Sequence, residues 1–333
     1  MISLLEGCRN IQQVEEKHWE YCKKLIIGKI ENELKKHSQK GNSNNDNSQN
    51  LDENELFFFE YIKNEENLRK IILGEPRKLE ALKRLFNCKF GGIFGENDKD
   101  NRRKNTAKEI FDYENLCKKC NKRWDAVKLV EAIGINTCPY CNRQYVFSFK
   151  KSNSKSVRPS LDHFYCRSKY PYFGLSLYNL IPSCDICNSR LKLDKEFTLK
   201  RNLHPYTESF HDHLRFSIKI KEVKNFFDDA DVGEIDFVRK GEYFIKAESN
   251  AKVFNLKAAY EQGHKDYIAE QIFKARVYND SWARSIMDEF AGLFASEEVL
   301  KRFYFGNYVR REDINKRPLA KLTIDILEEF GIK

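Results

Sequence analysis

Apolar residues recur at helical spacing over most of the first third of the chain. Such a spacing places the apolar side chains on one face of a helix. It predicts one or two helices over residues 3–36, a helical region over 56–86, and further helix near Ala107 and over 125–132.

Two polar stretches interrupt this helical pattern. Residues 38–54 form a low-complexity tract rich in Asn and Ser, and a second polar run covers 96–105 after three closely spaced glycines. Neither stretch has enough apolar surface to order itself. We therefore predict flexible loops at both places.

The second half of the chain changes from short strands to helices. The pattern over 137–203 indicates short strands and turns followed by a helix. Segments rich in β-branched and aromatic residues then predict strands over 215–220, 234–238 and 243–247. From Ala251 to Phe330 the spacing is helical again.

These patterns predict an α+β protein with three regions. A helical N-terminal region covers 1–129, a central module covers 130–205, and a C-terminal region with a small sheet followed by helices covers 206–333. The length of 333 residues suits roughly two domains.

Composition is that of a globular protein outside the membrane. Hydrophobic residues make up 41% and charged residues 33%, and no apolar run approaches the roughly 18 residues of a membrane span. The first residues lack the basic and apolar regions of a secretory signal. We expect a cytoplasmic protein with no membrane partner.

Positive charge is concentrated in one stretch. The net charge is +9, and from Lys118 to Arg201 there are 17 Lys and Arg against 6 Asp and Glu, a balance of +11. The rest of the chain therefore sums to −2. This distribution is typical of a surface that binds a polyanion, although a solvated lysine-rich face would look the same.

Ten cysteines in a cytoplasmic protein favour metal binding over disulfides. Six of them form three Cys-x-x-Cys pairs, at Cys117/Cys120, Cys138/Cys141 and Cys184/Cys187. Two such pairs supply four thiolates for a tetrahedral structural zinc site. Spacing alone does not decide which two pairs combine, because the 17 residues between the first and second pairs would also suit a zinc ribbon.

The residues between the second and third pairs decide this choice. They carry the polar side chains suited to chemistry, so we expect zinc to be held by Cys138, Cys141, Cys184 and Cys187. Cys117 and Cys120 are interpreted as an ordinary pair, with a second metal site completed from elsewhere as the alternative. A thioredoxin-like redox role for the second pair is disfavoured, since it requires a strand before the pair and a long helix after it.

Three polar residues are placed by the sequence near this zinc site. Asp162 and His163 follow a strand-like segment, and Asn188 lies directly after the third pair at the start of a predicted helix. Cys184 and Asn188 are four residues apart, so a helix beginning there would put both on one face. Hydrolysis of a phosphodiester needs a base for water and a cation to neutralise charge, and Asp, His and Asn can supply both.

Together these residues resemble a known family. The run Asp162-His163, then Asn179, then a Cys-x-x-Cys-Asn ending at Asn188 with Lys192 following, resembles the HNH or ββα-metal nucleases. The similarity is greatest to HNH nucleases of bacterial anti-phage systems such as Septu.

The resemblance implies a DNA endonuclease built on a ββα-metal core with a four-cysteine zinc site. It assigns His163 as the general base, Asn179 as the residue that holds the loop and the base in position, and Asp162 and Asn188 as ligands of a catalytic Mg²⁺ or Mn²⁺. It implies double-stranded DNA as substrate and an ATPase or sensor subunit as a controlling partner. Asn188 stands where many members have His, which leaves the strength and preference of metal binding open.

Other side chains near the motif receive simpler interpretations. Eight basic residues could contact backbone phosphates without reading sequence, namely Lys150, Lys151, Lys155, Arg158, Arg167, Lys169, Arg190 and Lys192. The aromatic residues over 164–173 are expected in the core, and His204 is expected to be structural.

Two other functions fit the same residues. One is an RNA-directed nuclease or toxin, because the motif acts on a phosphate and not on a sugar. The other is a zinc-stabilised module that binds nucleic acid without cutting it.

Overall fold

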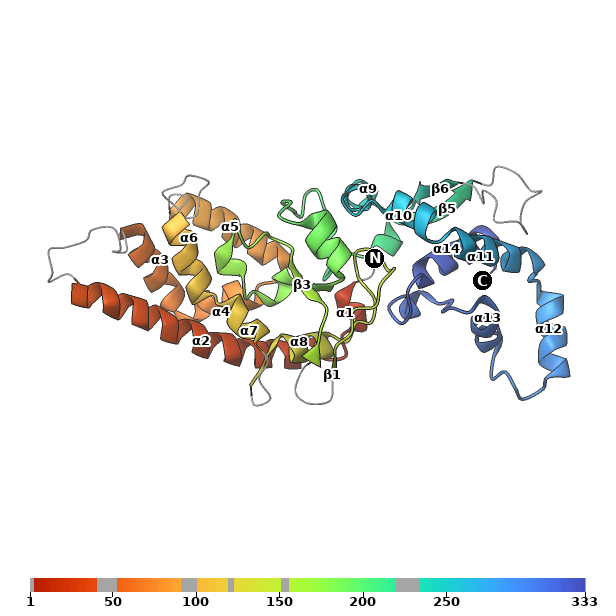
Figure 1. Cartoon of the computed structure of the whole chain (residues 1–333), viewed down its shortest axis with the longest axis horizontal. Helices are drawn as coiled ribbons and strands as arrows, with labels where there is room; N and C mark the ends of the chain where they lie inside the picture. Colours follow the sequence, from red (N-terminus) through yellow and green to blue (C-terminus); the bar gives the residue numbers. More distant parts are fainter. Residues whose placement is uncertain are drawn as a thin grey trace.

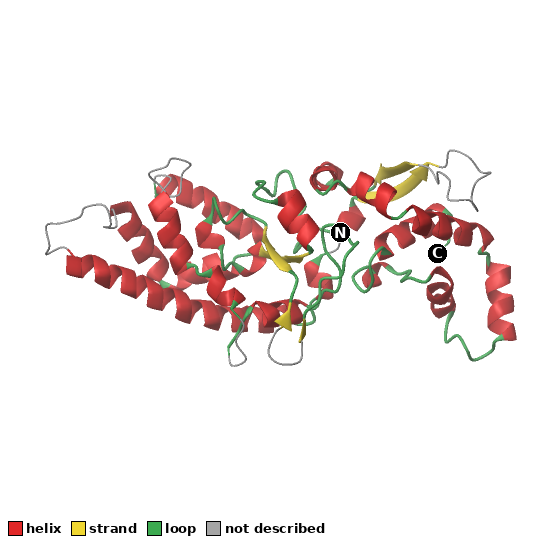
Figure 2. Cartoon of the chain, in the orientation of Figure 1, coloured by secondary structure: helices red, strands yellow, loops and turns green. Residues whose placement is uncertain are grey.

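The computed structural model describes residues 3–40, 53–90, 101–118, 123–150, 156–219 and 234–332. Within these ranges the chain is mostly helical, with three two-stranded antiparallel sheets. The molecule is elongated: N-terminal helices lie at one end, β3 lies near the middle, and C-terminal helices lie at the other end (Figure 1). The expected α+β class is confirmed, and Figure 2 shows how small the strands are beside the helices.

Eight helices form the described N-terminal region. They are α1 (Leu4–Gly7), α2 (Ile11–Lys40), α3 (Glu53–Lys63), α4 (Glu65–Leu73), α5 (Pro76–Lys89), α6 (Asn101–Ile110), α7 (Tyr113–Cys117) and α8 (Ala126–Ile133).

The predicted helices are confirmed here, but the predicted loops are wrong at their edges. Residues 38–40 continue α2, residues 53–54 begin α3, and residues 101–105 lie in α6. Extending an existing helix adds one hydrogen bond per residue without a new nucleation cost, so polar residues at a helix end stay helical. Residues 41–52 and 91–100 lie outside the described part of the chain.

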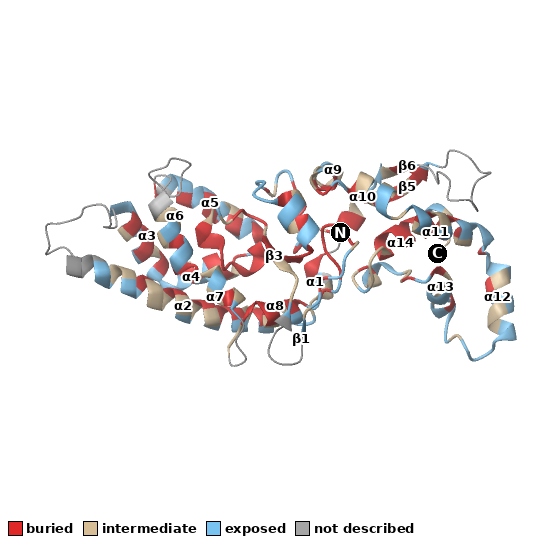
Figure 3. Cartoon of the chain, in the orientation of Figure 1, coloured by how far each residue is buried: buried red, intermediate tan, exposed pale blue. Residues whose placement is uncertain are grey.

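The N-terminal helices pack against the central module through aromatic rings. Phe58 of α3 and Phe86 of α5 both contact the ring of Tyr172, with centroids 6.2 and 5.0 Å apart. All three side chains are buried, and the buried residues line the inner faces of the helices (Figure 3). This apolar contact holds the loop between the two central strands in place.

The central module contains four short strands and one helix. They are β1 (Phe149–Lys150), β2 (Ser156–Val157), β3 (Ser160–His163), β4 (Leu180–Ser183) and the π-helical turn η4 (Ile186–Lys192). The 3₁₀ turns η2 (Pro171–Phe173) and η3 (Leu177–Asn179) lie between β3 and β4. β3 pairs antiparallel with β4, with Ser160 opposite Ser183 and His163 opposite Leu180.

The C-terminal region contains one two-stranded sheet and six helices among its described residues. After the turn η5 (Phe210–Asp212), these are β5 (Leu214–Lys219), β6 (Glu234–Arg239), α9 (Phe244–Val253), α10 (Leu256–Gly263), α11 (Lys265–Val277), α12 (Asp280–Glu289), α13 (Glu297–Phe305), the turn η7 (Arg311–Asp313) and α14 (Ala320–Glu329).

The first two predicted strands of this region are confirmed, and the third is wrong. Residues 244–247 open α9, which buries Ala247, Asn250 and Ala251. That spacing of three and four residues is helical, and the good helix formers Lys, Ala and Glu in this segment outweigh its aromatic and β-branched start. None of the helices in the described ranges has the length and apolarity that a membrane crossing requires.

One turn of the central module makes several buried hydrogen bonds to the C-terminal region. Asn142, directly after Cys141, is fully buried and has a positive φ of 50°, a conformation that Asn tolerates better than most residues. Its backbone oxygen accepts a hydrogen bond from the Leu319 amide (2.7 Å), and its side chain accepts one from the Lys321 amide (3.0 Å). The side-chain Nδ2 of Asn142 donates a hydrogen bond to the Ile314 carbonyl oxygen (3.0 Å).

Candidate functional site

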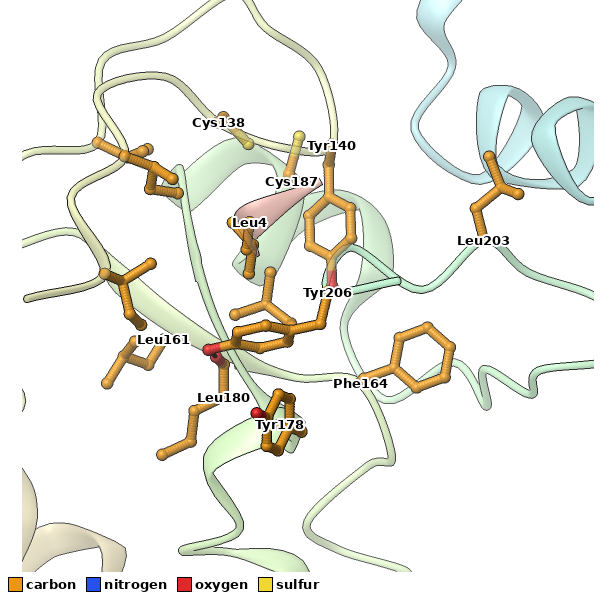
Figure 4. Packing of buried hydrophobic residues seen from close by; sticks show 14 of the residues in the cluster. Leu4, Cys138, Tyr140, Leu161, Phe164, Tyr178, Leu180, Cys187, Leu203 and Tyr206 are labelled. Carbon is orange, nitrogen blue, oxygen red and sulfur yellow. Dashed lines mark hydrogen bonds between the residues drawn. The ribbon is translucent and has the colours of Figure 1, made fainter. Parts of the chain in front are cut away.

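Four cysteine side chains converge at the start of the central module. Cys138, Cys141, Cys184 and Cys187 are buried, and their sulfur atoms all lie within 4.8 Å of one another. Figure 4 shows Cys138 and Cys187 close together, with Tyr140 extending from the same turn into the packed core. The expected choice of the second and third pairs is therefore confirmed. Cys117 is not in this cluster, and Cys120 lies outside the described residues.

This cluster has the geometry of a zinc site. The Sγ atoms of Cys141 and Cys184 are 3.9 Å apart, close to the about 3.8 Å edge of a tetrahedron with metal–sulfur bonds of about 2.3 Å. The Arg143 amide points at Cys141 Sγ (3.4 Å) and the Cys184 amide at Cys138 Sγ (3.5 Å). Such N–H···S contacts stabilise thiolates.

Thiolate character also follows from the surroundings of Cys138. Burial opposes its ionisation, but hydrogen bonds from the other three cysteines outweigh burial and hold the pKa of Cys138 well below its usual value. The same contacts raise the pKa of Cys141 and of Cys187. The four buried sulfur atoms lie close enough together to hold a zinc ion.

His163 lies at the end of β3, beside the hairpin loop. It is partly exposed, its Nε2 is 3.1 Å from the Gly174 carbonyl oxygen, and its ring meets the edge of Tyr113 at 4.7 Å between centroids. Burial lowers the pKa of His163 to about 3, the charges of Arg167 and Lys192 add to this effect, and the Gly174 hydrogen bond opposes it. The imidazole is neutral at pH 7.

Asp162 points to the opposite side of β3, as strand alternation requires. It is only 2% exposed. Its Oδ2 accepts a hydrogen bond from the Tyr140 hydroxyl (2.6 Å) and its Oδ1 one from Lys192 Nζ (3.0 Å). Tyr140 stands between Cys138 and Cys141, so the turn that carries the second cysteine pair also fixes this carboxylate.

Lys192 is not a phosphate-binding residue, contrary to the sequence-based interpretation. It is fully buried, and its ammonium group also donates to the His163 carbonyl oxygen (2.7 Å). Lys192 lies in the last turn of η4, and its two hydrogen bonds connect that helix to both Asp162 and His163 at the end of β3. Tyr140 and Lys192 are the partners of Asp162 that sequence reasoning missed.

Asn179 joins the two ends of the hairpin loop. It is fully buried. Its Oδ1 accepts from the Tyr165 amide (2.7 Å), and its Nδ2 donates to the carbonyls of Tyr165 (3.1 Å) and Phe173 (3.0 Å). These bonds hold the segment that carries the Gly174 carbonyl close to the end of β3.

Asn188 lies on the outer side of η4. Its amide donates to the Cys184 carbonyl (3.0 Å), so a turn does begin at the third cysteine pair. Its side chain is partly exposed and makes one long contact, of 3.4 Å, with the Ser189 hydroxyl.

These two asparagines make a matched test of the loop contacts. Asn179→Ala is expected to lower the free energy of unfolding by about 1–3 kcal/mol, because three buried backbone groups lose their partner. Asn188→Ala is expected to change it by less than about 0.5 kcal/mol, as for other partly exposed positions. Urea unfolding of the zinc-loaded variants measures both, and equal effects would contradict this account of the loop.

Asp162 and Asn188 do not fit a magnesium site in this conformation. Magnesium requires carboxylate oxygens open to its coordination shell. Both oxygens of Asp162 already accept hydrogen bonds, one of them from an ammonium group that would repel a second cation. Among the described residues, the four cysteines are the one group of three or more His, Cys, Asp or Glu side chains close enough to share a metal ion. The magnesium site stays a prediction.

The remaining sequence interpretations near the site are simple to place. Phe164, Tyr165, Tyr172 and Phe173 are buried in the core, as expected, and His204 is fully buried against Phe164. Lys151 and Lys155 lie outside the described residues.

Comparison with known proteins adds no relative: no family model, curated protein or solved structure matches the chain.

Proposed function

We propose that this protein is a nuclease of the HNH type that hydrolyses phosphodiester bonds with His163 as its general base. The observation that supports it most is the order of elements around His163: two antiparallel strands followed by a helix, with the base candidate at the end of the first strand. The buried cysteine cluster holds the turn before β3 against the start of the helix after β4.

The hydrogen bond of His163 identifies the atom that would take the proton. A carbonyl oxygen only accepts, so the bond to Gly174 requires the proton of the neutral imidazole to be on Nε2. Nδ1 then carries the free lone pair. In the proposed reaction Nδ1 removes a proton from water, the hydroxide oxygen bonds to phosphorus, and the bond from phosphorus to the 3′-oxygen breaks. The 3′-oxygen leaves with the bonding electron pair and takes a proton from solvent water, and His163 returns its proton to solvent, which leaves a 5′-phosphate and a 3′-hydroxyl.

Arg167 is the cation that we propose holds the phosphate. Its guanidinium stacks at 4.9 Å on the Tyr113 ring that contacts His163, donates from Nη1 to the exposed Glu114 carboxylate (3.0 Å), and belongs to a side chain that is 33% exposed. Its charge already acts on the imidazole. An Arg fork can bind two phosphate oxygens at once. We derive no step through magnesium, because Asp162 does not fit such an ion here.

The substrate and biological setting rest on the resemblance and on charge. A balance of +11 over 118–201 suits a nucleic-acid partner. The resemblance to anti-phage HNH nucleases leads us to propose DNA as the substrate, and an ATPase or sensor subunit as the controlling partner.

A second candidate is a zinc-stabilised module that binds nucleic acid without cutting it. One observation favours it: the carboxylate expected to ligate magnesium is sequestered by Lys192 and Tyr140.

Cleavage of a supercoiled plasmid, of single-stranded DNA and of an RNA transcript, each with Mg²⁺ or Mn²⁺, separates these candidates. If the nuclease proposal is right, His163→Gln lowers the cleavage rate by about 10²–10⁴-fold. Gln can still donate a hydrogen bond to the Gly174 carbonyl, so this variant removes the base while keeping the local contact.

His213→Ala is the matched control, because His213 lies outside the central module and contacts Tyr243. It is expected to cut at the wild-type rate. A folded, zinc-loaded wild-type protein that cuts none of the three substrates, alone or with the proposed ATPase or sensor subunit supplied, would reject the nuclease and favour the binding module.

A further inference from the structure

Three aromatic side chains are exposed on one face of the segment between the second cysteine pair and β3. Tyr145, Phe147 and Phe149 are 54%, 47% and 49% exposed, whereas Val146 between them is 1% exposed. This alternation is that of an extended strand with one buried face. We call the three exposed residues the aromatic ladder.

The ladder is a continuous apolar surface. The ring centroids of Tyr145 and Phe147 are 5.7 Å apart, and those of Phe147 and Phe149 are 6.1 Å apart. Val157 of β2 pairs with Phe149 and is itself 44% exposed, which extends the surface onto the second strand. Contiguous exposed aromatic rings on a folded protein mark a place where something binds.

The segment that carries the ladder is basic in sequence. The sequence from Asn142 to Ser160 contains five basic residues and no Asp or Glu. One of them, Arg158, follows Val157 directly and donates a hydrogen bond to the Pro159 carbonyl (2.8 Å). Arg158 and Pro159 are the two residues between β2 and β3, the strand that ends at His163.

We propose that the aromatic ladder binds the bases of a single-stranded segment of nucleic acid. Aromatic rings stack on bases of any sequence, and basic residues nearby hold the phosphates. The bases of a duplex are already stacked and out of reach of such rings, so the ladder selects an unpaired strand. This inference rests on the proposed function, which makes nucleic acid the partner.

The charge argues against another copy of the chain as the occupant. Two such segments facing each other would bring like charges together, which disfavours self-association. An acidic protein partner would also complement the positive charge. Such a partner does not explain a loss of affinity that depends on the bases of a strand, so the experiment below distinguishes it from nucleic acid.

The test is a binding measurement that needs no cleavage. Fluorescence anisotropy of the zinc-loaded full chain, without added Mg²⁺ or Mn²⁺, gives the Kd for a labelled oligothymidine strand. The same measurement is made for a duplex and for an abasic strand of equal length. The ladder variant is Tyr145→Ser/Phe147→Ser/Phe149→Ser, and its exposed positions make loss of folding unexpected.

The expected result is a Kd for oligothymidine raised about 10-fold or more in the ladder variant. The Kd for the duplex and for the abasic strand should stay within about twofold, since phosphate contacts remain. The control variant replaces three apolar residues of the C-terminal region that are more exposed than the ladder residues, Ile245→Ser/Leu293→Ser/Phe303→Ser. It should bind all three probes as the wild type does.

Three results would overturn the proposal. They are an unchanged Kd for oligothymidine, an equal loss on the abasic strand, and a wild-type dimer in light scattering that the ladder variant turns into a monomer. Failure of the proposed function is separate, because a chain that binds oligothymidine through the ladder but cuts no substrate keeps this inference and loses the nuclease.

Discussion

Replacing Cys184 and Cys187 together by Ser is expected to unfold the central module and release the C-terminal region. Binding of a structural zinc ion contributes about 10–16 kcal/mol of folding free energy in small zinc proteins. That is as large as the whole stability of a typical domain, about 5–15 kcal/mol. The module has few strand hydrogen bonds to replace it, since β3 and β4 are four residues each.

Zinc content and thermal unfolding by circular dichroism measure this effect. Cys88→Ser is the control, because Cys88 is an exposed free thiol, and it should keep both the zinc and the melting temperature of the wild type. Hydrogen exchange should rise first in the amides of Leu319 and Lys321, which bond to the turn after Cys141. A double variant that melts at the wild-type temperature would show that the cluster does not stabilise the fold.

The second large effect is expected from Lys192→Met. Met fills a similar volume but leaves the Asp162 carboxylate buried without its cation, and breaking a buried ion pair in this way costs about 3–5 kcal/mol. Urea unfolding of the zinc-loaded protein measures the loss. Lys195→Met is the control, since Lys195 is exposed and bonds only to the Leu191 carbonyl of its own turn.

A double variant shows whether the pair acts as a unit. Asp162→Asn/Lys192→Met removes both charges, and most of the lost stability should return because no charge stays buried alone. If the double variant is as unstable as the sum of the single variants, Asp162 and Lys192 are not coupled and the ion pair does not organise this site.

Much of the site was predictable because its determinants are local in sequence. Cysteines three residues apart form a metal-binding turn almost regardless of what surrounds them, and the choice between pairs followed from what lay between them. Asn179 was predicted to hold the loop; its three buried hydrogen bonds describe its contacts, and its effect on the base stays a prediction. Helices with regular apolar spacing could be placed closely: the helix predicted over 125–132 is α8, Ala126–Ile133.

The partners of Asp162 were not predictable, because they depend on burial. Lys192 looks like any lysine of a basic segment, and only the packing of η4 over β3 shows that its ammonium is enclosed. In the sequence, Tyr140 is only a residue between two cysteines. In the fold, its hydroxyl donates a hydrogen bond to the carboxylate of Asp162, which lies 22 residues further along the chain. Pairwise contacts across such separations have no signature in composition or periodicity.

The Asn142 turn also sets an order of events during synthesis. Its partners Ile314 and Lys321 lie 172 and 179 residues further along the chain. At about 5–20 residues per second the ribosome needs roughly 10–35 s to make that length. Both cysteine pairs have emerged well before then, so metal can shape the turn while its C-terminal partners are still unmade. The last helix, α14, then packs against a central module that is already folded. A shortage of zinc during translation would leave the central module unfolded when α14 is made.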